Sequence, residues 1–128
     1  MSMPSEHTQN EHERMAELHL ERGKRHFEKG EIGEAVSSLT ESYGFDPRRP
    51  ETLYLLAEIY GAAGFIDPAV DLIQKSLRED YMNVNAWIML ANLYAQKGGA
   101  YLDLALEQLN MAEGMDSNNS LIFYLYNI

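Results

Sequence analysis

Apolar residues recur along most of this chain at the three- and four-residue spacing of amphipathic helices, and short polar turns interrupt them. Thr8 and Glu11 form a capping box before the first helix. Gly30 can end that helix by adopting positive φ, and Asp67 followed by Pro68 is a good helix start. The pattern predicts six helices in three consecutive pairs, over about residues 9–29, 34–44, 51–63, 68–78, 84–97 and 101–114.

The hydrophobic pattern repeats along the chain with a period of 34 residues, because the small residues Gly23, Ala57 and Ala91 stand at that spacing. Ala105 lies 36 residues after Ala69, so two residues are inserted near residues 98–100, where we expect a longer loop. The repeated segments read His19-x-x-Arg22-Gly23-x-x-His26, Leu53-x-x-Leu56-Ala57-x-x-Tyr60 and Trp87-x-x-Leu90-Ala91-x-x-Tyr94.

These segments resemble the tetratricopeptide repeat (TPR), whose pattern is W-x2-L-G-x2-Y…A-x3-F…P. The segment from Trp87 to Tyr94 lacks only the glycine of the first half of that pattern. The resemblance implies an all-α, right-handed superhelical solenoid of antiparallel helix pairs. We expect a disordered N-terminal arm, three repeats within residues 10–119, and the start of a fourth repeat or a capping helix. Their expected ranges are 1–9 for the arm, about 14–49, 50–83 and 84–119 for the repeats, and 120–128 for the last segment.

In TPR proteins the first helix of each pair lines a concave wall, so the resemblance also implies a peptide-binding groove. Small residues at Gly61, Ala62 and Ala95 would leave room there for the backbone of a partner. This composition favours an apolar or helical peptide segment in the groove. At the matching positions the apolar residues are Leu20, Phe27, Tyr54 and Ile88, and the polar residues are Lys24, Glu58 and Asn92.

One subclass of TPR domains, which binds the acidic C-terminal tails of heat-shock chaperones, is disfavoured. Those domains clamp a carboxylate with Lys, Asn and Arg side chains. Only Lys24 fits that clamp in kind, and an acidic surface would repel such a tail. We therefore expect an apolar partner with basic flanks. The residues at the matching positions are Leu20, Lys24, Leu55, Asn85 and Met89.

The favoured function is a protein interaction module, acting as a scaffold or adaptor that binds a protein or peptide partner. One alternative is a three-repeat TPR chaperone for secreted bacterial proteins. The other is structural self-assembly, because the apolar segment after Ser120 cannot bury all its side chains against one repeat. That segment indicates a homo-oligomer or a fragment of a longer chain. Its candidate self-association residues are Leu121, Phe123, Leu125 and Tyr126.

Charge and composition exclude several other partners. The net charge of −10 argues against nucleic acid, which needs clustered Lys and Arg. No apolar run is long enough to insert into a membrane. The first residues do not have the pattern of a secretory signal, so a cytoplasmic location is expected, although a mature periplasmic form would look the same.

Three histidines, His12, His19 and His26, recur every seven residues on the first helix. At a rise of ~1.5 Å per residue, neighbours in this series lie about 10 Å apart, too far to share a metal ion. His19 and His26 also stand where the repeat pattern has Trp and Tyr, which favours packing. No nucleophile stands beside a base and no glycine-rich phosphate loop is present, so we expect no metal, no cofactor and no enzymatic activity.

Overall fold

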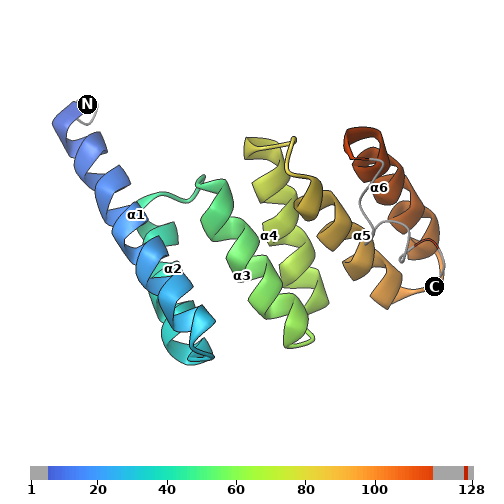
Figure 1. Ribbon diagram of the computed structural model, residues 1–128, viewed down its shortest axis with the longest axis horizontal. Coiled ribbons are helices and arrows are strands. Elements are labelled where there is room, and N and C mark those ends of the chain that lie inside the picture. Colours follow the sequence, from blue (N-terminus) through green and yellow to red (C-terminus); the bar gives the residue numbers. More distant parts are fainter. Residues whose placement is uncertain (1–5, 117–125, 127–128) are drawn as a thin grey trace.

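The computed structural model describes residues 6–116 and residue 126, and it places six helices in one row of pairs (Figure 1). Each helix packs most extensively against the other member of its pair, and α2–α3 and α4–α5 contacts join successive pairs. The predicted all-α solenoid of antiparallel helix pairs is therefore confirmed. The helices are α1 (Glu6–Glu28), α2 (Ile32–Phe45), α3 (Pro50–Ala62), α4 (Ile66–Glu79), α5 (Val84–Lys97) and α6 (Tyr101–Met115).

The first four helices begin one to three residues earlier than predicted, and for α1 and α4 the predicted capping residues are affected. The first helix begins at Glu6, so Thr8 lies inside α1 and residues 6–9 of the expected arm are helical. Helix α4 begins at Ile66, after Phe65, whose side chain makes no capping hydrogen bond. Asp67 therefore lies in the first turn, where its charge favours the helix dipole, and it forms an ion pair with Lys97 of α5.

The paired helices α1 and α2 approach each other closely at Gly23. A Cβ atom added to Gly23 would lie 2.7 Å from Cγ of Leu39 and 3.4 Å from the carbonyl oxygen of Ala35. Because Leu39 is fully buried, it has little room to move away. Glycine at this position therefore sets the distance between α1 and α2.

The turns inside the three pairs have the same length, residues 29–31, 63–65 and 98–100, although the sequence predicts a longer third loop. Gly30 and Gly64 adopt φ of 78° and 91°, and the amides of Glu31 and Phe65 donate to carbonyls five residues earlier. The third turn instead contains two glycines of positive φ, Gly98 and Gly99. The predicted longer loop is therefore wrong. The helices take up the two extra residues, because α5 is one residue longer than α3, and Ala105 is the fifth residue of α6 whereas Ala69 is the fourth of α4. Helix α6 keeps Ala105, Leu109 and Ala112 buried.

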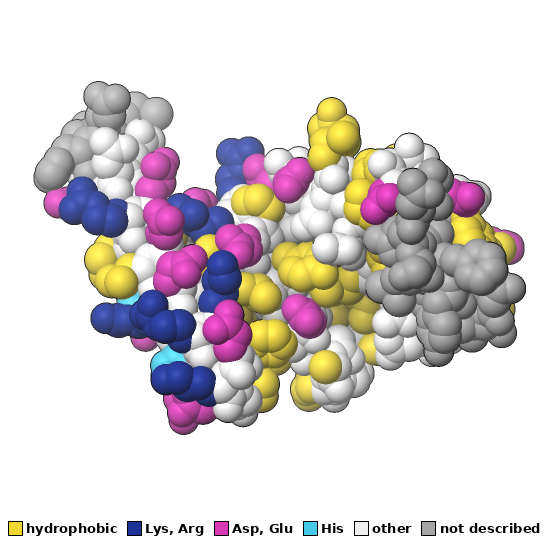
Figure 2. All heavy atoms as spheres, in the orientation of Figure 1, with side chains coloured by type: hydrophobic (Ala, Val, Ile, Leu, Met, Phe, Trp, Pro, Cys, Tyr) yellow, Lys and Arg dark blue, Asp and Glu magenta, His cyan; other side chains and the backbone are white. Residues whose placement is uncertain are grey.

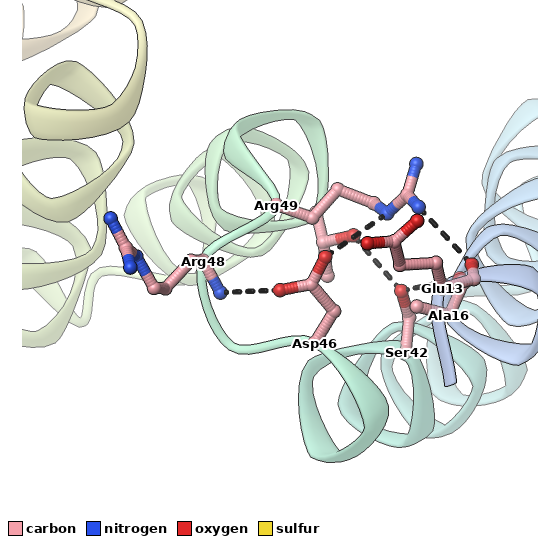
Figure 3. A network of polar contacts seen from close by, with 7 residues as sticks. Glu13, Ala16, Ser42, Asp46, Arg48 and Arg49 are labelled. Carbon is pink, nitrogen blue, oxygen red and sulfur yellow. Dashed lines mark hydrogen bonds and ion pairs between the residues drawn. The ribbon is translucent and has the colours of Figure 1, made fainter. Parts of the chain in front are cut away.

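A buried polar contact joins the first two pairs (Figure 3). The Ser42 hydroxyl on α2 donates to the carbonyl oxygen of Ala16 on α1 at 2.7 Å and lies 3.0 Å from the Thr52 hydroxyl on α3. Ser42 and Thr52 are both fully buried. One hydroxyl therefore ties three helices together, and sequence patterning did not identify it.

The connection between α2 and α3 is held by charged side chains around Asp46 (Figure 3). Asp46 accepts a hydrogen bond from the Arg48 amide at 3.1 Å and lies 3.8 Å from Nε of Arg49. Arg49 also donates to the carbonyl oxygen of Glu13 at 3.1 Å. This connection is thereby attached to α1.

Several predictions fall on residues that the structure does not describe. Residues 1–5 of the expected arm and most of the expected final helix lie outside the described residues, as do Leu121, Phe123 and Leu125. Of the self-association residues only Tyr126 is described, and its hydroxyl donates to Oδ1 of Asn110 on α6 at 2.5 Å. Within the described part of the chain, none of the helices has the length and apolar character to span a bilayer.

Candidate peptide-binding groove

Two of the apolar residues predicted for the groove, Leu20 and Ile88, are instead core residues. Leu20 is 1% exposed and packs in a cluster with Leu39 and Leu56, whereas Ile88 is 3% exposed and packs with Ala112. Their spacing placed them on the inner side of α1 and α5, but the neighbouring helices cover them. The predicted apolar strip therefore loses two of its four members.

The other two predicted apolar residues, Phe27 and Tyr54, are half-buried. Phe27 packs against the cluster that contains Leu20 and Leu39, while Tyr54 packs against a second cluster, which contains Ala57 and Ile73. Each ring is thus held by the core on one side and remains partly accessible to solvent. Of the four apolar residues predicted for the groove, only these two offer accessible ring surface.

Glu58 lies one helical turn after Tyr54 on α3 and is half-buried. Burial raises the pKa of the Glu58 carboxyl above its ordinary value. The pKa of the Tyr54 hydroxyl is raised first by burial and then by the negative charge of Glu58. Among the described residues, none forms an ion pair with Glu58. The position predicted for the groove therefore holds a desolvated carboxyl group with no cationic partner among the residues that the structure describes.

Lys24, the one basic residue predicted for the groove, is already paired. Its ammonium lies 2.9 Å from Oε1 of Glu51 on α3 and 3.6 Å from Oε1 of Glu21 on α1. A hydrogen bond to Glu51 is the largest cause that raises the pKa of Lys24. This ion pair links α1 to α3, so Lys24 is not a free cation for a partner.

The small residues predicted to leave room for a partner serve different purposes. A Cβ atom on Gly61 would lie 3.1 Å from Cδ2 of Leu93 and 3.6 Å from Cβ of Ala69. Gly61 therefore makes room for α5 of the next pair, which corrects the prediction. Ala62, Ala95 and the polar residue Asn92 are exposed.

His19 and His26 of α1 contact different glutamates, whereas His12 and His19 share the ring of Phe45. His19 is 7% exposed, its ring stacks on Phe45 at 5.6 Å, and its Nδ1 atom lies 3.0 Å from Glu41. His26 instead hydrogen-bonds Glu31 in the following turn at 3.0 Å. The predicted packing role is therefore confirmed for His19.

Charge and apolar surface are unevenly distributed on the face seen in Figure 2. Hydrophobic side chains gather over α3–α5 in the middle of the molecule, and Lys and Arg side chains gather over α1. Asp and Glu side chains lie among both groups. A partner on this face would therefore meet apolar surface bordered by acidic groups.

Comparison with solved structures identifies the fold. The first TPR domain of Spaghetti (RPAP3), bound to the HSP90 peptide SRMEEVD, is 17% identical, with a TM-score of 0.80 over 88% of this chain and 87% of that one. The Arabidopsis OM64 TPR domain is 15% identical, with a TM-score of 0.81 over 88% of this chain and 92% of that one. The chain thus has the fold of a TPR domain.

MamA is a further similar structure, 22% identical with a TM-score of 0.74. The match covers 80% of this chain but only 58% of MamA, so this chain spans little more than half of that protein. Neither a protein-family model nor a curated protein sequence matches the chain.

Proposed function

We propose that this chain is a TPR-type interaction module that binds a peptide with an apolar anchor and basic flanks in the groove formed by α1, α3 and α5. The observation that carries the proposal is Glu58, a half-buried carboxylate with no cationic partner in the described part of the chain. Burying a charge without a partner costs free energy. A Lys or Arg side chain of a peptide would recover that cost.

The apolar half of the proposal depends on Phe27 and Tyr54. Both rings are fixed by the core behind them and partly open to solvent, so little side-chain entropy is lost when a partner covers them. An aliphatic or aromatic side chain of the peptide would pack against Tyr54 while its basic neighbour approaches Glu58. This arrangement requires the two peptide residues to lie close together.

The RPAP3 domain binds an acidic peptide, SRMEEVD, but the corresponding positions here do not favour that chemistry. Leu20 is buried, and Lys24 is held between Glu21 and Glu51. A carboxylate ligand would have to displace these two glutamates and would also approach Glu58. We therefore infer that the groove selects the opposite charge.

Selection of random peptides displayed on phage tests this proposal without assuming a partner. Wild-type protein should enrich peptides in which Lys or Arg neighbours a large apolar residue. The variant Glu58→Gln should lose that enrichment. Glu34→Gln, which removes the same charge from an exposed position on α2, is the matched control and should keep it. Enrichment of acidic peptides, or the same basic peptides from both variants, would contradict the proposal.

A further inference from the structure

Two clefts lie on either side of α4, outside the groove described above. The first, of about 300 Å³, lies between α4, α2 and the start of α3, and its lining includes Tyr43, Arg48, Lys75, Arg78 and Glu79. The second, of about 500 Å³, lies between α4, α5 and α6, and its lining includes Gln74, Arg78, Tyr81, Trp87, Tyr94 and Gln108. Residues 34 apart, such as Leu53 and Trp87, line the two clefts, so they are equivalent junctions between repeats.

The first cleft is basic, although the chain as a whole is strongly acidic. Three of the ten Lys and Arg residues of the chain line it. Arg48 is neutralised by Glu79, with Nε 2.9 Å from Oε1, and Lys75 lies 3.0 Å from Oδ2 of Asp71. Arg78 has no ion pair within the described part of the chain. The positive charge of this cleft is therefore available mainly at Arg78.

A small anionic group could be held there by several donors. Asp71 and Tyr43 raise the pKa of Lys75, whereas the positive charge of Arg78 lowers it. Tyr43, Lys75 and Arg78 are therefore near neighbours. Tyr43 lines the same cleft and carries a hydroxyl that can donate a further hydrogen bond. An Arg–oxyanion contact gains from two parallel hydrogen bonds, which is the geometry that carboxylate and phosphate groups offer.

The second cleft is aromatic rather than charged. Tyr81 is 65% exposed, and the Trp87 indole donates to its carbonyl oxygen at 2.7 Å, which fixes both residues. Gln74 donates to the Tyr94 hydroxyl at 2.9 Å. These hydrogen bonds hold the polar ends of the aromatic side chains and leave ring surface in the cleft. Such a surface suits another aromatic ring.

Arg78 lines both clefts, so they flank the same ridge of α4. Neighbouring helices pack about 8–10 Å apart, which places the clefts roughly 10 Å from each other. An extended peptide covers that distance in about three residues.

We propose that the two clefts form a second peptide site, which takes a side-chain oxyanion in the first cleft and an aromatic side chain three residues away in the second. The oxyanion is either the carboxylate of an acidic residue or a phosphate on a serine. The site is separate from the proposed groove, because α3 and α5 contribute other residues to it, and none of Phe27, Tyr54 and Glu58 lines either of the two clefts. Its ligand also has the opposite charge.

Trp87 is the single tryptophan of the chain, so its fluorescence reports on this site. Three peptides serve as probes. The first is N-acetyl-Ser-Glu-Ala-Ser-Phe-Ser-amide, the second has phosphoserine in place of its Glu, and the third, the control, has Gln in place of its Glu. At least one of the Glu and phosphoserine peptides should change the Trp87 emission. It should also bind about tenfold or more tightly than the Gln control, because hydrogen bonds to charged groups contribute ~1.5–3 kcal/mol. The tighter of the two identifies the source of the oxyanion.

Arg78→Gln should weaken that binding about tenfold, since Arg78 is exposed and makes no ion pair that the fold requires. Arg25→Gln, an equal change of charge at an exposed position on α1, should leave it unchanged. Glu58→Gln should also leave it unchanged, so the two proposals succeed or fail separately. No change in Trp87 emission, equal binding of all three peptides, or equal loss in Arg78→Gln and Arg25→Gln would overturn the second site.

Discussion

Ser42 and Ser76 lie 34 residues apart and make equivalent hydrogen bonds, each to the carbonyl oxygen of the residue 26 positions earlier. Ser42 donates to Ala16 at 2.7 Å, and Ser76 donates to Pro50 at 2.9 Å. In both cases the hydrogen bond attaches the second helix of a pair to its own first helix. The third pair has Ala112 at this position, fully buried and without a hydroxyl. The first two helix pairs therefore share this side-chain hydrogen bond, and the third pair lacks it.

Replacement of these serines should have unequal effects on the free energy of unfolding. Ser42→Ala removes a hydrogen bond and also deprives the buried Thr52 hydroxyl of its partner, so we expect a loss of about 1–3 kcal/mol. Ser76→Ala removes one hydrogen bond and should cost about 0.5–1.5 kcal/mol. Urea denaturation measures both. Ser37→Ala, at an exposed position on α2, is the control, and an equal loss in all three variants would contradict the account.

Gly23→Ala should destabilise the protein although alanine favours helices. The new Cβ would lie 2.8 Å from Cδ2 and 2.7 Å from Cγ of the buried Leu39 side chain. Overpacking costs about 1–3 kcal/mol, which outweighs the ~1 kcal/mol gained in helix propensity. Gly44→Ala on α2 meets no atom within 4 Å and should therefore stabilise the protein. The thermal unfolding midpoints of the two variants, each relative to wild type, measure these effects. A higher midpoint for Gly23→Ala would contradict the close contact between α1 and α2 at this position.

Leu20→Ala tests its reassignment from groove wall to core. Truncation of a buried leucine costs about 2–5 kcal/mol. Asn92→Ala, at an exposed position that the sequence placed on the same wall, should change stability by less than about 0.5 kcal/mol. Urea denaturation curves of the two variants give the difference. If Leu20→Ala proved as mild as Asn92→Ala, Leu20 would belong to the surface after all.

The course of the chain could be predicted from sequence because the signals are local. The bounds of α5 agree with the prediction, but the longer loop expected from the spacing of Ala69 and Ala105 is absent, because α5 and α6 take up the two extra residues. The start of α4 could not be predicted in the same way. Asp67 has the residue type of a cap, but Gly64 turns the chain early enough for the helix to begin at Ile66.

The site was less predictable, because helical periodicity gives the direction of a side chain and not what covers it. Leu20 and Tyr54 occupy matching positions in successive repeats, yet Leu20 is covered by residues of α2 and α3. The pairing of Lys24 with Glu51 depends likewise on the distance between two helices. The clefts beside α4 combine residues from three or more elements, so no single segment reveals them.

The raised pKa of Glu58 gives a pH dependence with a defined sign. A carboxyl whose pKa is higher in the folded protein than its ordinary 4.5 contributes stability below pH 4.5, and that contribution is lost as the pH rises through the higher value. The stability of Glu58→Gln relative to wild type should therefore increase as the pH rises from below 4.5 to neutrality. Urea denaturation of dilute protein across this range measures the trend. A difference that shrinks with rising pH would contradict the burial of Glu58.

Nuclear magnetic resonance mapping of a peptide selected on the wild-type protein tests the interaction module most directly. Titration of ¹⁵N-labelled protein with that peptide should shift the backbone amide signals of Lys24, Tyr54, Glu58 and Asn92, on the helices that form the groove. The same titration of Glu58→Gln should leave these signals largely in place. Shifts confined to α2, α4 and α6, or a response that does not depend on Glu58, would contradict the proposed groove.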